Sequence, residues 1–212
     1  MFRALFSIYF LLLFLGANAQ RGGWTADGNG NYSVDGSGIH KTDFTSKAKE
    51  LLVPSEWYTP KGATKPLELK GYTFSEDFSA VLIFTNTRRV WRYETRGDYW
   101  YLNLKTKTLQ QVGKSLPEAS LMFAKLSPNG KQVAFVSKNN LYSEELSTGK
   151  IKQLTFGTGK LISGTFDWVY EEEFDCRDGF RWSPDSKSLA FWEIDANTIR
   201  DFYMINTTDS IY

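Results

Sequence analysis

The sequence of 212 residues contains very few of the side chains that most often carry chemistry in small sites. Cys176 is the only cysteine, so no intrachain disulfide can form and a Cys-x-x-Cys metal site is excluded. His40 is the only histidine, and a Ser-His-Asp triad within these residues would have to use it. Because His40 follows a Gly- and Ser-rich stretch typical of a turn, we expect no hydrolytic chemistry within residues 1–212.

An excess of charge of one sign is also absent. The chain has 25 Lys and Arg against 24 Asp and Glu, a formal net charge of +1. Nucleic acids and acidic surfaces attract proteins with a clear positive excess, so this balance indicates no such partner. The hydrophobic fraction of 42% is enough for a globular core.

The chain lacks long apolar runs except near its N-terminus. Arg3 precedes an apolar stretch at residues 5–15, and Ala17 and Ala19 provide a small-x-small cleavage site. We predict a secretory signal peptide over residues 1–19, cut between Ala19 and Gln20, with an uncleaved anchor as the alternative. An exported protein without disulfides fits a bacterial periplasm better than a eukaryotic secretory route. We therefore expect a periplasmic or secreted protein with no stable membrane insertion after cleavage.

Three segments repeat one pattern, in which an apolar or aromatic residue and a serine precede a turn with Asp or Asn and then a strand-like run. The copies begin Phe74-Ser75-Glu76-Asp77, Leu126-Ser127-Pro128-Asn129 and Trp182-Ser183-Pro184-Asp185. Their serines are 52 and 56 residues apart. Short strands repeated at about this period are typical of β-propeller blades.

The remaining segments agree with an all-β fold. Residues 99–112 and 140–154 each read as a strand, a polar turn and a second strand, and no long helical period occurs. We expect residues 20–70 to form an irregular first blade, in which residues 45–53 could form one or two helical turns. We predict a partial β-propeller of about three to four blades over residues 20–212. Four tryptophans are expected in its core: Trp91, Trp100, Trp182 and Trp192.

The segment at residues 167–174, Asp-Trp-Val-Tyr-Glu-Glu-Glu-Phe, is the most unusual in the chain. Three adjacent carboxylates repel one another, so a buried strand would not carry them. Aromatic residues on both sides favour a fixed projection, which would make a cation site; a solvated acidic turn is the alternative. Asp167 would cap the segment if it is helical, and Trp168 and Tyr170 are expected to pack. Three consecutive side chains suit Ca²⁺ poorly, so we predict no metal and no cofactor.

The acidic segment, followed by Phe180-Arg181-Trp182-Ser183-Pro184-Asp185, closely resembles the dipeptidyl peptidase IV family of exported serine peptidases. Val90-Trp91-Arg92-Tyr93 and Asp98-Tyr99-Trp100-Tyr101 resemble the arginine-bearing blade of that family. The resemblance runs from about Leu67 to Tyr212 and is weaker before that. The acidic segment is specific to the family, whereas the Trp-Ser-Pro-Asp pattern occurs in many propellers.

The resemblance implies an eight-bladed propeller that caps a C-terminal α/β-hydrolase domain. It also implies an activity that removes dipeptides from peptide N-termini, with Pro or Ala preferred as the second residue. It implies that Glu172 and Glu173 bind the α-ammonium of a peptide substrate with a free N-terminus. Arg92 would contact the substrate carbonyl and help to hold the glutamates. The family's catalytic serine, aspartate and histidine belong to the later domain, so residues 1–212 contain no catalytic residue by this resemblance. The chain is thus expected to be the N-terminal part of a longer protein.

Other interpretations stay open at this point. The chain could be a non-enzymatic periplasmic propeller that serves as a binding scaffold, or a relative with tripeptidyl peptidase specificity or no activity. A scaffold gives no reason for the acidic segment to occur together with Trp91-Arg92. Glu171 would support the local fold or face solvent. The sequence also leaves open whether the full-length protein forms a homodimer.

Overall fold

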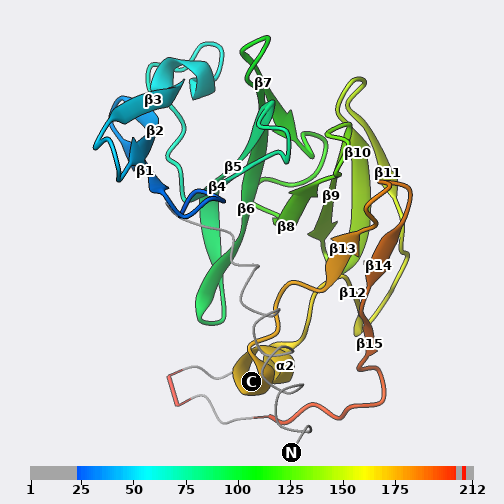
Figure 1. The fold of residues 1–212 in the computed structure, drawn as a ribbon. Helices are drawn as coiled ribbons and strands as arrows, with labels where there is room; N and C mark the ends of the chain where they lie inside the picture. The colour runs from blue at the N-terminus through cyan, green and yellow to red at the C-terminus, as the bar shows by residue number, and fades with distance from the viewer. Residues whose placement is uncertain (1–22, 204–206, 209–212) are drawn as a thin grey trace, which may run out of the picture. The chain divides into compact units, whose positions relative to one another are not determined.

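The computed structural model describes residues 23–203, 207 and 208, so the predicted signal peptide lies outside the described residues. Within them, the chain forms two compact units (Figure 1). The first unit contains residues 23–88 and 97–119, and the second contains residues 89–96 and those from 120 onward. No helix in the described part of the chain is long and apolar enough to cross a bilayer.

The first unit begins with a regular three-stranded antiparallel sheet in the order β1-β2-β3. Its strands are β1 (Gly30–Asp35), β2 (Gly38–Asp43) and β3 (Lys49–Pro54), and the 3-10 helix η2 (Ser55–Tyr58) follows. The predictions of an irregular first blade and of helical turns at 45–53 were therefore wrong. Residues 49–54 instead pair with β2, because Val53 can then be fully buried.

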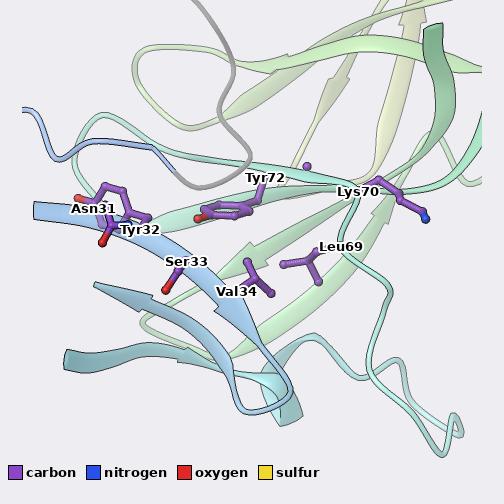
Figure 2. Close-up of a pocket in the computed structure, with 8 residues that line it drawn as sticks. Asn31, Tyr32, Ser33, Val34, Leu69, Lys70 and Tyr72 are labelled. Carbon is purple, nitrogen blue, oxygen red and sulfur yellow. The ribbon is translucent and has the colours of Figure 1, made fainter. Parts of the chain in front are cut away.

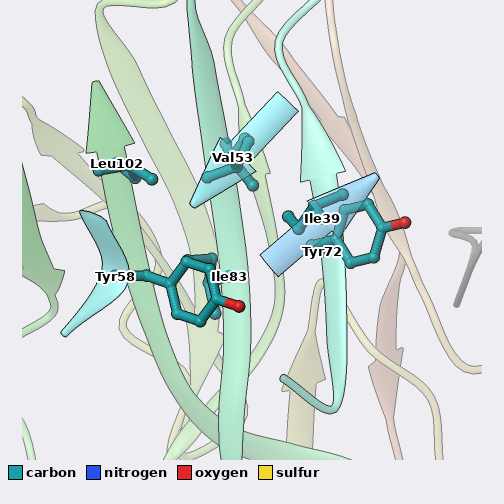
Figure 3. Close-up of a cluster of buried hydrophobic side chains, with 7 residues drawn as sticks. Ile39, Val53, Tyr58, Tyr72, Ile83 and Leu102 are labelled. Carbon is teal, nitrogen blue, oxygen red and sulfur yellow. The ribbon is translucent and has the colours of Figure 1, made fainter. Parts of the chain in front are cut away.

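A meander of four consecutive strands completes the first unit, except that residues 89–96, at the tip of its β5–β6 hairpin, belong to the second unit. They are β4 (Gly71–Phe74), β5 (Ala80–Val90), β6 (Tyr93–Asn103) and β7 (Thr108–Val112), in the order β4-β5-β6-β7. Figure 3 shows the core that joins this meander to the three-stranded sheet. Its buried side chains come from six elements and are Ile39, Val53, Tyr58, Tyr72, Val81, Ile83 and Leu102.

The second unit contains another four-stranded meander and two short strand pairs. The meander is β8 (Leu121–Leu126), β9 (Gln132–Ser137), β10 (Asn140–Glu145) and β11 (Lys150–Gln153). The pairs are β12 (Leu161–Ser163) with β15 (Glu193–Asp195), and β13 (Phe180–Trp182) with β14 (Leu189–Phe191). The helix α2 (Trp168–Phe174) lies between β12 and β13 in the sequence. Its core consists of Ala134, Val136, Leu141 and Phe180.

The three predicted repeat turns make the same hydrogen bonds. In the first, the Ser75 hydroxyl donates to Asp77 at 2.7 Å and accepts from the Ala80 N–H at 2.9 Å, while Asp77 accepts from the Ser79 N–H. The turns at Ser127 and Ser183 repeat these three bonds with Asn129 and Asp185. Each serine thus satisfies a backbone donor that the tight turn would otherwise leave unpaired.

A fourth copy of this turn starts at Thr25 and was not predicted. The Thr25 hydroxyl donates to Asp27, and Asp27 accepts from the Asn29 N–H at 3.0 Å. The Thr25 N–H donates to the carbonyl of Gly30, as the serine N–H does in the other copies. Thr25 lies 50 residues before Ser75, so the repeat extends through the first sheet.

The fold is therefore all-β and corresponds to part of a β-propeller, as predicted. Trp100 and Trp182 pack against the buried clusters, which confirms two of the four expected core tryptophans. Trp91 and Trp192 are 47% and 66% exposed, so the prediction was wrong for them. Trp91 lies in the turn between β5 and β6, and Trp192 lies between β14 and β15, where the chain changes its pairing partner.

Lys125 on β8 is an unusual partly buried cation in the second unit. Its ammonium pairs with Asp178, lies 3.8 Å from the centroid of the Phe180 ring and donates to the carbonyl of Phe123 at 3.0 Å. Burial lowers the pKa of Lys125 to about 8, although the negative charge of Asp178 opposes this shift.

We predict that Ser127→Ala lowers the free energy of unfolding by roughly 1–3 kcal/mol, because it removes a buried hydroxyl and leaves the Gln132 N–H without the acceptor that it has there. Urea denaturation provides the measurement. Ser147→Ala, at an exposed position in the β10–β11 turn, is the matched control. Equal stability of the two variants would contradict this role of the serine.

We predict that Lys125 makes stability increase with pH above its folded pKa. Between pH of about 8 and 10.5 the unfolded chain binds the proton that the folded chain has released, so the free energy of unfolding rises by up to ~1.4 kcal/mol per pH unit. Lys125→Met should reduce this slope between pH 8 and 10, and Lys187→Met, at an exposed side chain, should not. Identical slopes in all three proteins would refute the prediction.

Candidate functional site

The helix α2 lies in a loop of the second unit, residues 166–177, and contacts between the residues that flank this loop join its two ends. Thr165 and Asp178 form an isolated antiparallel bridge, and the Thr165 hydroxyl donates to the carbonyl of Arg177 at 2.9 Å. A Cβ atom on Gly179 would come within 2.9 Å of the carbonyl carbon of Gly164, so only glycine permits this approach of the two backbones. Residues 166–177 are therefore held at both ends.

The acidic segment is helical, and Asp167 is its N-cap as predicted. The Asp167 carboxylate accepts a hydrogen bond from the Tyr170 N–H at 3.1 Å. The helix ends at Asp175, which has a left-handed φ of 54°, and the Cys176 N–H donates to the carbonyl of Tyr170 at 3.1 Å. Because both ends of this seven-residue helix are capped, its glutamates have defined directions.

Three consecutive glutamates on α2 have three different environments. Successive residues of an α-helix point about 100° apart, so the three side chains diverge and their mutual repulsion falls. Glu171 is buried, with 6% of its surface exposed. The Glu172 side chain is 12% exposed, and Glu173 is exposed to solvent.

Arg92 forms an ion pair with the middle glutamate. The Arg92 Nε lies 2.7 Å from Glu172 Oε1, although the Arg92 side chain is 71% exposed. Arg92 occupies the second position of the two-residue turn between β5 and β6, after Trp91 with its positive φ of 52°. The sequence-predicted Arg92 and Glu172 are thus in contact, and Glu173 is the next residue along the helix.

Arg177 makes a contact beside this turn, and Glu171 is a buried residue of α2. The Glu171 Oε1 atom is buried without a hydrogen-bond partner. Burial raises the pKa of Glu171, and the nearby Arg177 charge opposes that shift. The Arg177 guanidinium lies 4.1 Å from the centroid of the Tyr93 ring and pairs with Asp175 at 2.6 Å. Sequence reasoning did not single out Arg177.

The arrangement can bind a cation that carries N–H donors. Glu172 pairs with Arg92 through one oxygen, and Glu173, the next residue of the helix, has an exposed carboxylate. Carboxylates accept charge-assisted hydrogen bonds from ammonium groups, and these are stronger than bonds between neutral groups. Among the described residues, no group of three or more His, Cys, Asp or Glu side chains is arranged to hold a metal ion.

The aromatic residues of α2 pack less than the sequence predicted. The Tyr170 ring contacts Phe166 and Phe174, with centroids 5.5 and 5.7 Å away, which agrees with a packing role. Trp168 is 51% exposed, so the prediction that it packs was wrong for the described residues.

His40 lies next to a serine and an aspartate but does not form a catalytic triad with them. The Ser37 hydroxyl and the Asp35 carboxylate lie 2.8 and 2.9 Å from the same ring nitrogen, Nε2. In a triad the nucleophile and the acid contact opposite nitrogens of the imidazole. Here Nδ1 is buried without a hydrogen-bond partner, so the ring cannot relay a proton in that way.

A separate pocket in the first unit has a volume of about 390 Å³ (Figure 2). It is lined by residues of β1 and of the segment that enters β4, including Tyr32, Val34, Leu69 and Tyr72. None of its lining residues is acidic, and Lys70 is its one basic residue. Because it lacks carboxylates, this pocket does not offer the chemistry that the acidic segment provides.

Comparison with known proteins gives a consistent result. Residues 75–212 match the model of a family described as the dipeptidyl peptidase IV (DPP IV) N-terminal region. Two curated relatives named "Probable dipeptidyl-aminopeptidase B", from Arthroderma gypseum and Talaromyces marneffei, are 31% and 33% identical to this chain. The alignments cover 81% and 77% of this chain but 19% and 18% of the relatives, so the chain spans about a fifth of their length.

A solved structure supports the same fold. The crystal structure of Porphyromonas gingivalis dipeptidyl peptidase 4 aligns with 82% of this chain and 25% of its own, with a TM-score of 0.67. At 23% sequence identity this likeness shows the fold alone. The substrate-binding role of Arg92, Glu172 and Glu173 stays a prediction.

We predict that Asp167→Ala destabilises α2 selectively, because the Tyr170 N–H loses its acceptor at the start of a seven-residue helix. Such a cap contributes about 1 kcal/mol, or roughly a fivefold change in the local opening equilibrium. Amide hydrogen exchange of peptides covering residues 167–176 should accelerate, and Asp167→Asn should restore protection. Unchanged exchange in the alanine variant would show that the cap does not hold the helix.

Proposed function

The chain belongs to the dipeptidyl peptidase IV family, and from this premise we propose that it is the substrate-gating propeller segment of a serine exopeptidase. The enzyme would release dipeptides from peptide N-termini, with Pro or Ala preferred second. The contact between Arg92 and Glu172, with Glu173 beside it, is the observation that carries the proposal. It pairs Arg92, which the sequence resemblance assigns to the substrate carbonyl, with one of the two glutamates that it assigns to the substrate amine.

The chemistry of a peptide N-terminus fits this site. An α-ammonium group has a pKa near 8, so it is largely charged at neutral pH. It can donate one charge-assisted hydrogen bond to each of the two carboxylates. The positive charge of Arg92 reduces the repulsion between Glu172 and Glu173. Arg92 is also mostly exposed, so part of its guanidinium remains available to a substrate carbonyl oxygen.

The same site would reject internal and blocked peptide segments. A substrate without a free amine brings no positive charge, and it would cover both carboxylates without pairing them. Leaving a charged group desolvated and unpaired costs more than the hydrogen bond itself contributes. The distance from the fixed amine to the scissile bond would then select dipeptides, with cleavage performed by the hydrolase domain that the family resemblance implies.

We propose that the full-length protein is exported, with a periplasmic or secreted location. The proposal rests on the predicted signal peptide and on the single cysteine, which needs no oxidative pairing. Peptides with free N-termini would be its substrates in that compartment.

We predict that Glu172→Gln and Glu173→Gln, each in the full-length enzyme, lower kcat/KM for a free-amine dipeptide substrate by ~100-fold or more, because each removes one ionic partner of the ammonium. Hydrolysis of Ala-Pro-p-nitroanilide gives the rate. Glu145→Gln, at an exposed acid that ends β10, is the control and should retain the parent activity.

Nearly unchanged activity in both glutamine variants would refute the amine-binding role. An inactive parent protein with normal folding would instead support the non-enzymatic scaffold.

A further inference from the structure

We propose that Lys125 and Asp178 are positioning residues that hold the loop of α2 on strand β8 and so fix the direction of its glutamates. The inference rests on the function proposed above and concerns two residues outside the predicted amine site. Asp178 directly follows the loop of residues 166–177, and Lys125 pairs with it from β8. The pair therefore joins the end of the loop to the four-stranded meander of the second unit.

Lys125 is held both at its main chain and at its ammonium. The indole N–H of Trp182, on β13, donates to the Lys125 carbonyl at 3.1 Å. The ammonium donates to the Phe123 carbonyl at 3.0 Å and lies 3.8 Å from the centroid of the Phe180 ring. A lysine charge usually moves with its flexible stem, and these contacts restrict it. The ammonium can thus act as a fixed partner for Asp178.

The backbone of β8 is irregular where Lys125 leaves it. Its pairing with β9 shifts register between Met122 and Lys125, and Phe123 between them has a left-handed φ of 55°. A β-bulge re-aims the side chains beside it, and a left-handed φ is unfavourable for a bulky residue. Strained residues of this kind persist where surrounding contacts over-determine them. The bond from the Lys125 ammonium to the Phe123 carbonyl is one such contact.

Asp178 is the residue through which the loop joins the rest of the second unit. It forms the antiparallel bridge to Thr165 that closes the loop. One oxygen of its carboxylate pairs with Lys125, and the other lies 3.0 Å from the Arg181 guanidinium. The Lys125 side chain is 24% exposed and that of Arg181 is 58% exposed. Because exposed ion pairs constrain little, Lys125 is the partner that holds Asp178 in place.

The direction of α2 determines whether the amine site can form. Glu172 and Glu173 precede Asp178 closely in the sequence, and Glu172 must meet Arg92 from the β5–β6 turn. A rotation of the loop about its base would move both carboxylates together. Misplacing a binding group by about 1 Å can change rates up to ~100-fold, even when the cause lies far from the chemistry.

Stability does not explain a lysine at this position. A partly buried ion pair is often no better for stability than apolar side chains of similar size. Among the described residues, the charged side chains that face the Lys125 ammonium are Asp178 and Arg181. Burial lowers the pKa of Lys125 to about 8 in spite of Asp178, so the pairing does not offset the loss of hydration. Orientation of the loop gives a reason for the charge.

The test is a double-mutant cycle in the full-length enzyme at pH 7, measured with Ala-Pro-p-nitroanilide. Lys125→Met keeps an unbranched side chain and removes the charge. It should raise KM roughly tenfold and change kcat less than about twofold, because the amine site loses its alignment. Asp178→Asn should act in the same direction, and in that background Lys125→Met should add less than about twofold. Lys131→Met, exposed between β8 and β9, is the control and should match the parent.

The pH dependence of KM separates positioning from a general loss of packing. The Lys125 ammonium loses its proton near its pKa of about 8, whereas methionine has no proton to lose. The KM of Lys125→Met divided by that of the parent should therefore fall from roughly ten at pH 7 to less than about three at pH 9.5. The substrate ammonium also titrates near pH 8, but its effect is common to both proteins and cancels in the ratio. A ratio of ten at both pH values would contradict the role of the charge.

Amide hydrogen exchange of the same full-length proteins gives a readout that does not depend on activity. Peptides covering residues 166–177 should exchange roughly tenfold faster at pH 7 in Lys125→Met and at the parent rate in Lys131→Met. The Tm of Lys125→Met should not fall, since the costly buried charge is gone. Equal KM in Lys125→Met and the parent, or unchanged exchange at residues 166–177, would overturn the positioning role. Failure of the proposed function is distinguishable, because Glu172→Gln and Glu173→Gln would then retain activity whatever the exchange result.

Discussion

The ion pair between Arg92 and Glu172 joins two segments that are far apart in the sequence, and the candidate site depends on it. One segment is a two-residue turn between long strands and the other is a helix of seven residues. Neither could hold its charges in place alone: the turn contains a strained tryptophan, and the helix contains three adjacent glutamates. When the two segments are in contact, the turn supplies the positive charge of Arg92 and the helix supplies the negative charge of Glu172. The site therefore forms only when the second unit is folded.

The acidic helix illustrates how one local sequence can give three functions to one residue type. Successive residues of an α-helix point about 100° apart, so the side chains of Glu171, Glu172 and Glu173 lie in different surroundings. The first is buried, the second pairs with a guanidinium, and the third faces solvent. The closed base of the loop at Thr165 and Asp178 fixes which direction each one takes.

The sequence predicted the repeat architecture well because its signals are local. The turns at Ser75, Ser127 and Ser183 and the hairpins that follow depend on hydrogen bonds within a few residues. The copy at Thr25 was missed because threonine replaces serine there, although the Thr-x-Asp spacing was visible. The strand at 49–54 was also missed, since its partner β2 rather than its own composition determines its conformation.

The site was predicted only in part, for a physical reason. Charge and motif identified Arg92, Glu172 and Glu173, but the burial of Glu171 and the stacking of Arg177 on Tyr93 arise from tertiary contacts that no local pattern reveals. Likewise, the exposure of Trp91 and Trp192 follows from their positions in a turn and between strand pairs, whereas their residue type favours burial.

The most direct measurement is a crystal structure of the full-length protein with an Ala-Pro dipeptide bound. The account predicts that the α-ammonium nitrogen lies about 3 Å from one oxygen of Glu172 and one of Glu173. The Arg92–Glu172 contact should be retained. A dipeptide whose amine lies away from α2, with Glu172 and Glu173 both still hydrated, would contradict it.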